Sequence, residues 1–345
     1  MTFSEHILKW YGQYKRELPW RSTREPYKIW LSEIILQQTR VVQGMPYYHK
    51  FLDAFPTVYE LANASEEQVL KLWQGLGYYS RARNLHATAK MVVEEYDGRF
   101  PNTYKELKNL KGVGDYTASA IASICFDLPE PVVDGNVYRV LARYFGVELP
   151  INSTEGVKYF KDLAREVMNT ANIRDYNQGI MEFGAIQCAP KKPYCLHCPL
   201  NESCVALKEN RVANLPVKIN KTKIKSRYFN YLVFLDKGRK TILEQRTGKG
   251  IWQNLYQFPL LESNKVLDKK MLEDELESKN GFPIFKSIEL INQEPIVHKL
   301  SHQHLNTRFW ILETEQVIKK GVSWENIESF PVPVLIADFI KTFKI

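Results

Sequence analysis

The chain has 345 residues, with 47 Lys and Arg against 39 Asp and Glu, and a formal net charge of +8 at pH 7. This length allows two domains, and 44% hydrophobic with 25% charged residues is the composition of an ordinary soluble protein. No apolar run is long enough to span a membrane, and the N-terminus lacks the apolar core of a signal peptide. We therefore expect a cytoplasmic protein with no membrane partner, whose basic charge suits a polyanion without identifying one.

The N-terminal part of the chain is predicted to be helical. Residues 1–19 carry an apolar stripe, and a second helix follows Pro26 with Trp30 and Val41 at helical spacing. Glu33 lies among the apolar residues of this second helix. It is either solvated at the edge of the stripe or held in a partly apolar site, where desolvation would raise the pKa of its carboxyl.

A glycine-aromatic turn, Gly-Leu-Gly-Tyr-Tyr at 75–79, follows a helix predicted to start at the N-cap Ser65. Arg81 and Arg83 open the next helix. Aromatic rings stack on bases and guanidinium groups pair with phosphate, so the turn suits a wedge that enters nucleic acid. A tight helix–helix turn with a core tyrosine is the alternative.

A second glycine turn, Leu-Lys-Gly-Val-Gly at 110–114, joins two helical patterns within 101–122. Glycine allows close approach of the backbone, and the N–H groups that start the following helix can face an anion. This is the form of a helix-hairpin-helix, which binds the DNA backbone without distinguishing sequence. A plain helical hairpin is the alternative.

Asp134 stands at the head of the next predicted helix, in the stretch Val-Val-Asp-Gly-Asn at 132–136. The N–H groups of that helix start favour an ionised carboxylate. The residue is either a simple N-cap or a functional carboxylate, and one side chain can serve both purposes.

Four cysteines, Cys188, Cys195, Cys198 and Cys204, are gathered in one short stretch with intervals of six, two and five residues. In an intracellular protein this spacing indicates a metal centre more than disulfides. An all-cysteine set fits either tetrahedral zinc or a [4Fe–4S] cluster. The fifth, Cys125, lies in an apolar helical run and is predicted to be a core residue.

Residues 208–227 are rich in Lys and Arg and are predicted to be a basic linker, either a solvated tether or a strap along phosphate. A β pattern begins at residue 228. We expect strands over 228–235, 240–246 and 298–312, a charged helix near 266–279 and a closing helix over 334–343. The second domain is therefore predicted to be α+β.

Together these motifs resemble the helix-hairpin-helix DNA glycosylase superfamily, and within it the MutY-type adenine DNA glycosylases. The resemblance covers nearly the whole chain and rests on these stretches: LPWR at 18–21, PYKIWLSEIILQQTRV at 26–41, GLGYYSRARNL at 75–85, LKGVGDYTASAI at 110–121, VVDGNVYRVLAR at 132–143, MEFGAIQC at 181–188, the cysteine spacing, GIWQNLYQFPL at 250–260 and HKLSHQHL at 298–305.

The resemblance implies a multi-domain fold. An all-α helix-hairpin-helix glycosylase domain with an iron–sulfur cluster loop would be followed by an α+β Nudix-like domain that recognises 8-oxoguanine. The implied boundaries are 1–207 for the glycosylase domain (a six-helix module at about 20–125 and an iron–sulfur module of 1–19 plus 126–207, with the cluster loop at 188–204), 208–227 for the linker and 228–345 for the Nudix-like domain.

The resemblance also implies the substrate and the cofactor. The partner would be double-stranded DNA containing an A:8-oxoguanine or A:G mismatch, bound by a monomer. The enzyme would flip out the adenine and hydrolyse its N-glycosidic bond. The four cysteines would hold a [4Fe–4S] cluster, and the hairpin would have room for a monovalent or divalent cation.

Hydrolysis of this bond needs two carboxylates with opposite duties, one protonated to assist the leaving base and one ionised to face the sugar. By resemblance Glu33 is the acid and Asp134 the carboxylate beside C1′. Bifunctional relatives of endonuclease III type carry a lysine where this chain has Tyr116, and tyrosine cannot form a Schiff base. We therefore predict a monofunctional glycosylase that leaves an abasic site.

Further positions follow from the same resemblance. The segment 261–285 shows no acidic run of the nucleotide-hydrolysing Nudix type, and Leu300 replaces the usual phenylalanine beside the serine. Leu36 and Leu76 have ordinary core leucines as their alternative interpretation. The implied adenine pocket consists of Arg21, Trp30 and Leu36, and the implied contacts to DNA and 8-oxoguanine are Gln38, Thr39, Leu76, Tyr78, Gly112, Gly114, Ser301 and His302.

Two other functions are compatible with parts of the sequence. The first is an endonuclease III-like bifunctional glycosylase and lyase, against which Tyr116 and the additional C-terminal domain count. The second is a non-catalytic protein that binds DNA damage and uses its carboxylates for structure alone. Incubation with a mismatched duplex followed by hot alkali separates the second from an enzyme, because alkali cleaves DNA only where a base has been removed.

Overall fold

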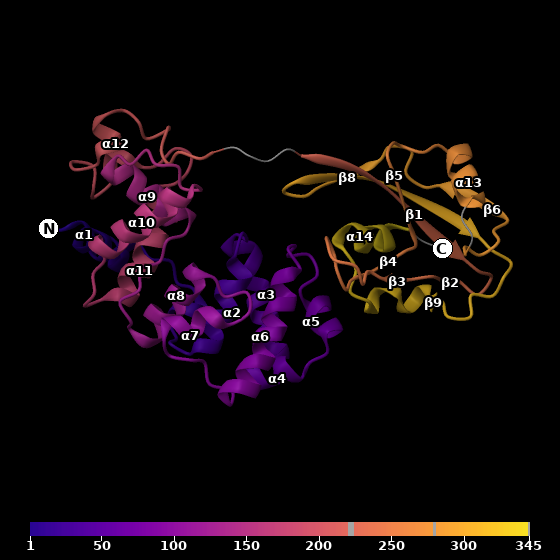
Figure 1. Cartoon of the computed structure of the whole chain (residues 1–345), viewed down its shortest axis with the longest axis horizontal. Helices are drawn as coiled ribbons and strands as arrows, with labels where there is room; N and C mark the ends of the chain where they lie inside the picture. The colour runs from indigo at the N-terminus through magenta and orange to yellow at the C-terminus, as the bar shows by residue number, and fades with distance from the viewer. Residues whose placement is uncertain (220–223, 279–280, 344–345) are drawn as a thin grey trace. The chain divides into compact units, whose positions relative to one another are not determined.

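The computed structural model of the chain describes residues 1–219, 224–278 and 281–343 (Figure 1). Residues 220–223 of the predicted linker, residue 279 of the predicted helix 266–279 and the last two residues of the predicted C-terminal domain lie outside them. The chain forms two compact units, Met1–Asn63 with Asn84–Asn220, and Ala64–Arg83 with Lys221–Ile345. Each is described by itself.

The first unit is helical, and none of the described helices of the chain is both long and apolar enough to cross a membrane. Short turns of 3-10 helix at Pro19–Arg21 and Cys195–His197 and a π-helix at Phe183–Gln187 add to the α-helices. The α-helices are α1 (Phe3–Tyr14), α2 (Pro26–Leu36), α3 (Val41–Ala54), α4 (Val58–Asn63), α6 (Ser80–Tyr96, whose first residues belong to the second unit), α7 (Tyr104–Asn109), α8 (Asp115–Phe126), α9 (Gly135–Phe145), α10 (Thr154–Val167), α11 (Ile173–Glu182) and α12 (Val205–Lys208).

Helices α2 and α8 form the interior of this unit. Every residue from Thr117 to Ile124 in α8 is buried, and α8 packs against α2, α7 and α11. In α2 all residues from Ile29 to Ile35 are buried. A helix that is apolar on all sides is stable only inside a core. These two helices therefore carry any polar side chain on them, including Glu33, into the interior.

The second unit contains a mixed sheet with the strand order β5-β1-β8-β6, in which β7 also pairs with β8. β1 and β8 are parallel along their whole length, and the other pairs are antiparallel. The elements are α5 (Glu66–Leu72), β1 (Lys225–Leu235), β2 (Lys240–Thr241), β3 (Glu244–Gln245), β4 (Tyr256–Gln257), β5 (Leu260–Ser263), α13 (Lys269–Glu277), β6 (Ser287–Leu290), β7 (Ile296–Lys299), β8 (Gln303–Glu313), β9 (Val322–Ser323), a 3-10 helix (Trp324–Ser329) and α14 (Val334–Thr342).

The two faces of the sheet have separate cores, because successive side chains of a strand point to opposite faces. On one face Trp310 of β8 belongs to an apolar cluster with Leu272 and Leu276 of α13. On the other face the ring of Phe309 stacks on that of Phe339 of α14, with their centroids 4.0 Å apart. The sheet is thus covered by α13 on one side and α14 on the other, which confirms the α+β prediction.

The strand predicted over 298–312 is wrong in one respect, because the chain turns within it. β7 ends at Lys299 and β8 begins at Gln303, and Leu300 N–H donates to the Gln303 carbonyl at 2.8 Å to close the turn between them. An alternating pattern does not reveal a tight hairpin that lacks glycine. The turn places Ser301 and His302 at the tip of a β-hairpin, where side chains are accessible to a ligand.

Residues 64–83 pack with the second unit. The start of α5 is capped by Ser65, as predicted, in a box closed by Gln68. Asn254 Nδ2 donates to Glu66 Oε1 at 2.5 Å, and Arg83 donates to the carbonyl of Gln253 at 2.9 Å. These bonds attach the glycine-aromatic turn 75–79 to the unit that contains the sheet.

Glu182, at the end of α11, is the most deeply buried ion-pair partner of the first unit that the structure describes. Its side chain is 1% exposed. Its Oε2 accepts from Arg16 at 2.6 Å and from Arg21 at 2.7 Å, and its Oε1 accepts from Arg16 Nε at 2.7 Å. The backbone N–H of Arg16 also donates to Glu182 at 3.0 Å. The helix predicted over 1–19 is shorter than expected and ends at Tyr14, where the backbone of Lys15 becomes extended. Burial raises the pKa of Glu182, but the two arginines outweigh it and lower the pKa to about 2.

We predict that Glu182→Gln lowers the free energy of unfolding at pH 7 by about 2–3 kcal/mol, because it leaves two partly buried guanidinium groups without a charged partner. A lowered carboxyl pKa stabilises the fold above its unfolded value near 4.5, and this contribution disappears as the pH falls toward 2. The difference from the wild type should therefore shrink below pH 4.5. Urea unfolding across this range measures it, with Glu166→Gln on the exposed face of α10 as the control. Equal midpoints for both variants at pH 7 would contradict the prediction.

Candidate active site and nucleic-acid interface

Glu33 is a carboxyl group held inside the helical core. It lies on α2 and is 9% exposed. Burial raises its pKa to about 7; a hydrogen bond from Tyr116 acts in the opposite direction, and the negative charge of Asp134 adds to the increase. The sequence left open whether Glu33 is solvated or held in a partly apolar site, and the structure shows that it is buried. A carboxyl with this pKa is partly protonated at neutral pH and can donate a proton.

Tyr116 lies in the first turn of α8, directly after the glycine hairpin. Its hydroxyl has two possible acceptors for its single proton, Met181 Sδ at 3.1 Å and the carboxyl of Glu33, whose pKa a bond from Tyr116 lowers. Burial and the nearby charges of Glu33 and Asp134 raise the pKa of the Tyr116 phenol well above 10. The phenol is therefore neutral, and it orients the acid without offering a nucleophilic amine.

Asp134 is the N-cap of α9. Its Oδ1 accepts from the backbone N–H groups of Asn136 and Val137 at 2.9 and 2.8 Å, and its Oδ2 accepts from the Asn136 side-chain amide at 2.7 Å. Burial raises the pKa of Asp134, while these donors and Arg139 act in the opposite direction. Hydrogen bonds to the charged form favour ionisation, so Asp134 is better suited than Glu33 to remain a carboxylate.

The fold brings these three residues together from α2, α8 and the cap of α9. The pKa of Tyr116 responds to both acids, and that of Glu33 responds to Tyr116 and Asp134. One acid is buried with a single phenolic donor, and the other receives three N–H groups. Two neighbouring carboxyls in such different surroundings can act as an acid and an anion at the same pH.

The residues of the implied adenine pocket differ in accessibility. Arg21 is held by Glu182, and its second nitrogen donates to the Arg16 carbonyl at 2.8 Å. Leu36 is half-buried at the end of α2. Trp30 is 0% exposed, its ring lies 5.2 Å from that of Phe100, and its indole N–H has no hydrogen-bond partner among the described residues. In this conformation Trp30 is therefore a core residue that has no surface available to a ligand.

The two glycines of the hairpin differ in whether the fold itself requires them. Gly112 has φ +77°, and a Cβ on it would lie 2.7 Å from Asn84 Cβ, so the turn itself requires glycine. Gly114 caps α8 with φ −84°, and a Cβ on it would meet no described atom within 4 Å. No described atom of the protein excludes a side chain at Gly114. A ligand that packs closely against this backbone would leave no room for a side chain, which is a reason for glycine here.

The four clustered cysteines line one cavity. Cys188, Cys195, Cys198 and Cys204 surround it together with Arg143, whose guanidinium donates to Cys188 Sγ at 3.4 Å. Four thiols and a neighbouring cation form a donor set that fits a thiolate-bound cluster. No group of three or more His, Cys, Asp or Glu in the described part of the chain is arranged to hold a metal ion as it stands.

Three functional side chains went unrecognised in the sequence. Arg139 and Arg143, one turn apart on α9, bind the first cysteine; Arg139 donates to the Cys188 carbonyl at 2.8 Å and to Asn136 Oδ1 at 2.9 Å. Their spacing of four residues in VVDGNVYRVLAR is the signal that places them on one helix face. Glu182 has no comparable signal, because nothing in its neighbourhood shows that both arginines fold onto it.

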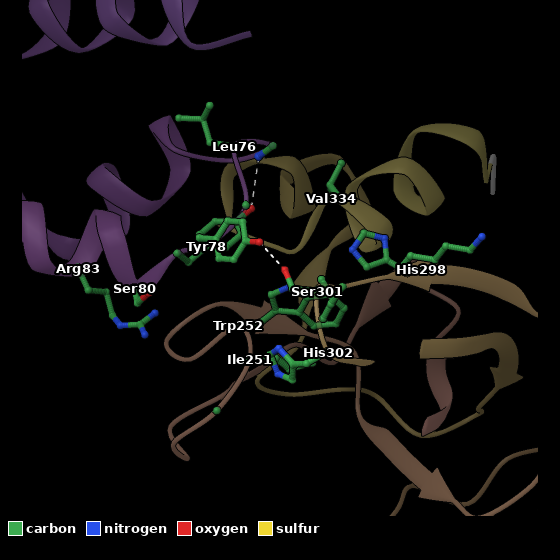
Figure 2. Close-up of a pocket in the computed structure, with 16 residues that line it drawn as sticks. Leu76, Tyr78, Ser80, Arg83, Ile251, Trp252, His298, Ser301, His302 and Val334 are labelled. Carbon is green, nitrogen blue, oxygen red and sulfur yellow. Dashed lines mark hydrogen bonds between the residues drawn. The ribbon is translucent and has the colours of Figure 1, made fainter. Parts of the chain in front are cut away.

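In the second unit the turn 75–79 and the hairpin tip 300–302 line one cavity of about 520 Å³ (Figure 2). Leu76, Tyr78, Ser301 and His302 all contribute to it, and the hydroxyls of Tyr78 and Ser301 share a hydrogen bond. Trp252 and His298 add aromatic walls that the sequence did not indicate. Four of the predicted contact residues thus meet at one site.

Gln38 and Thr39 belong to the first unit, in the bend that follows α2. Gln38 is exposed with φ +55°, in the left-handed region that non-glycine residues rarely occupy. Tyr78 in the second unit shares this property with φ +46° and is 48% exposed. Strained exposed residues of this kind are common at ligand-binding positions.

The chain matches the family model of the HhH-GPD superfamily base excision DNA repair proteins over residues 31–186 and that of the NUDIX domain over residues 230–342. Among curated relatives, the adenine DNA glycosylase of Buchnera aphidicola subsp. Baizongia pistaciae is 36% identical over 356 residues, covering 100% of this chain and 98% of the relative. The adenine DNA glycosylase of Mus musculus is 33% identical over 400 residues, and the match covers 99% of this chain and 77% of the mouse protein.

Solved structures agree for the helical part. A thermostable thymine-DNA glycosylase superposes with a TM-score of 0.56 and 33% identity, covering 60% of this chain and 95% of that one. A non-covalent endonuclease III–DNA complex matches with a TM-score of 0.53 and 22% identity over 60% of this chain and 94% of that one, which supports the fold. The predicted fold class, a helix-hairpin-helix glycosylase domain followed by a Nudix-like domain, is confirmed. The chain belongs to the adenine DNA glycosylase family.

Proposed function

We propose that the protein is a monofunctional adenine DNA glycosylase of base excision repair, acting in the cytoplasm as a monomer on double-stranded DNA. Its substrate would be adenine mispaired with 8-oxoguanine or guanine. The observation that carries this proposal is the buried Glu33, with a pKa of about 7, beside Tyr116 and Asp134. Membership of the family indicates that the excised base is adenine. The geometry supports Glu33 as the proton donor and Asp134 as the carboxylate that stays ionised.

The chemistry of the reaction assigns a duty to each carboxyl. Adenine is a poor leaving group, so Glu33 donates a proton to the base as the bond between C1′ and the base nitrogen breaks. Positive charge then develops on the sugar. The carboxylate of Asp134, kept ionised by the start of α9, faces that charge, and addition of water to C1′ leaves an abasic site.

DNA would be held through its backbone at the glycine hairpin. The open backbone at Gly114 and the N–H groups that start α8 face outward for a phosphate, close to a turn that Gly112 shapes. A cation at this hairpin would add to the same contact. Gln38 and Tyr78 would enter the base stack after flipping, and Arg21 and Leu36 would line the pocket of the extruded adenine.

The cavity of the second unit would recognise 8-oxoguanine. Ser301 offers a hydroxyl at the hairpin tip, next to His302, Tyr78 and Leu76. By the family resemblance, Thr39 would be a further contact to the lesion. A hydroxyl can both donate and accept, which suits an oxidised purine edge with a new N–H and a new carbonyl. We expect no nucleotide hydrolysis from this unit.

The cysteines Cys188, Cys195, Cys198 and Cys204 would hold a [4Fe–4S] cluster. The bound cluster would be a rigid staple of the loop 188–204, and no step of base excision passes through it. The guanidinium of Arg143, which already contacts Cys188 Sγ and the carbonyl of Ala189, would offset the negative charge of the thiolates.

We predict that Glu33→Gln abolishes excision and leaves mismatch binding intact, since glutamine has a similar shape and no proton to give. The single-turnover rate on an A:8-oxoguanine duplex should fall at least about 100-fold. In the wild type this rate should fall as the pH rises above about 7, where Glu33 loses its proton. Glu25→Gln, an exposed change at the cap of the same helix, is the matched control. Retained excision in Glu33→Gln would remove Glu33 from the mechanism.

We predict that borohydride traps no efficient covalent adduct between the protein and the substrate, because Tyr116 takes the position of the Schiff-base lysine in the bifunctional relatives. The duplex should remain intact after excision until hot alkali is added. Trapping is measured by gel shift under denaturing conditions, with a lysine-bearing endonuclease III-type enzyme as the positive control. A stoichiometric adduct that forms at the rate of excision would favour the bifunctional alternative.

We predict that Ser301→Ala reduces the preference for A:8-oxoguanine over A:G, because it removes one hydrogen-bonding group from the cavity. The ratio of the two dissociation constants should fall about five- to tenfold, the value of roughly one hydrogen bond. Ser278→Ala at the exposed end of α13 serves as the control. An unchanged ratio would place lesion recognition elsewhere.

A further inference from the structure

Lys161 is a mostly buried lysine whose ammonium group has three polar partners. It lies on α10 with its side chain 16% exposed. Its Nζ is 2.9 Å from Asp115 Oδ2, 2.9 Å from Ser119 Oγ and 2.8 Å from the Pro131 carbonyl. A lysine has three N–H donors, and all three are used here, so the ammonium group is held in one place.

The three partners belong to the two segments that carry the candidate active site. Asp115 is the first residue of α8 and immediately precedes Tyr116, and Ser119 lies one turn further along the same helix, fully buried. Pro131 is three residues before Asp134, in the segment that leads to the cap of α9. One ammonium group therefore joins the helix of Tyr116 to the segment of Asp134.

A second, neutral link supports the same segment. Asn177 of α11 is 0% exposed and donates to Ser123 Oγ and to the carbonyl of Glu130, both at 2.8 Å. The link through Lys161 differs from it in using a charge. Moving an ammonium group out of water carries a large desolvation penalty unless its partners are well placed, and an apolar side chain would fill the same space with a smaller penalty. The lysine supplies directional bonds, which an apolar side chain lacks.

The charges around the ammonium group explain why it is tolerated. Asp115 provides the counter-charge, and its other oxygen accepts from the Tyr104 hydroxyl, with Lys108 3.9 Å away. Burial raises the pKa of Asp115, but the bonds from Tyr104 and Lys161 outweigh it and hold the pKa below its usual value. The same contacts that hold the ammonium group therefore also favour the ionised form of Asp115, its counter-charge.

We propose that Lys161 is a positioning residue for base excision, which holds Asp134 at its working distance from Tyr116 and Glu33. This inference rests on the proposed function. Without the ammonium group the segment 130–134 loses its charged attachment to α8 and keeps the one through Asn177. A shift of about 1 Å in a group that stabilises a transition state can cost about 100-fold in rate.

The test compares Lys161→Met, which keeps most of the stem, with Lys158→Met on the exposed face of the same helix, which removes the same charge. The full-length protein is assayed on an A:8-oxoguanine duplex, with the single-turnover rate at saturating protein and the dissociation constant measured separately. We expect the rate of Lys161→Met to fall about 10- to 100-fold. Its dissociation constant should change much less, and Lys158→Met should excise as the wild type does.

Ser119→Ala is the second variant, since it removes one partner of the ammonium group with little loss of volume. It should lower the rate severalfold, and combined with Lys161→Met it should add nothing further, because both changes break the same link. Lys161→Arg should recover part of the rate. Equal rates for Lys161→Met and wild type, or additive losses in the double variant, would overturn the inference. If the wild type itself excises no adenine, the proposed function fails first.

Discussion

The desolvation of one carboxyl group sets the conditions for the rest of the site. A pKa of about 7 for Glu33, in place of 4.5, corresponds to about 3 kcal/mol of disfavoured ionisation. Because the folded state binds this proton more tightly than the unfolded chain does, the cost to stability grows as the pH rises from 4.5 to 7. Two helices buried on all sides, α2 and α8, create the environment that imposes the cost. Burial of Glu33 therefore lowers the stability of the fold at neutral pH, and it keeps this carboxyl partly protonated there.

The second carboxyl shows the opposite use of the backbone. Asp134 is buried too, and burial raises its pKa, yet it caps α9 and receives three N–H groups. Ordinary N-capping, the alternative interpretation of this residue, thus supplies the donors that a working carboxylate needs. The same helix then continues to Arg139, which bonds both the Asn136 side chain and the carbonyl of Cys188. One short helix, α9, thus begins at a cap that is also a candidate catalytic anion, and it is bonded to the cysteine loop through Arg139.

Local signals in the sequence predicted much of this, and long-range ones did not. The caps at Ser65 and Asp134 and the glycine hairpin at 110–114 follow from the chemistry of a few adjacent residues, and the structure confirms them. The environment of Glu182 depends on Arg16 and Arg21 more than 160 residues away, and that of Lys161 depends on side chains of two other segments. No periodic pattern encodes such partners. Trp30 shows the same limit, because the sequence does not reveal that its ring is completely buried in this structure.

The division of the chain by packing adds a constraint that the order of the sequence hides. Residues 64–83, which include the turn 75–79, are flanked along the chain by two stretches of the first unit, yet Glu66 and Arg83 bond to residues 254 and 253 of the second. Tyr78 and Ser301 consequently belong to one compact body, and Glu33, Tyr116 and Asp134 belong to another. The proposed contact to the lesion, Ser301, and the proposed contact to the base stack, Tyr78, are then positioned together. Their shared hydrogen bond is made within that body, so it requires no particular arrangement of the two units.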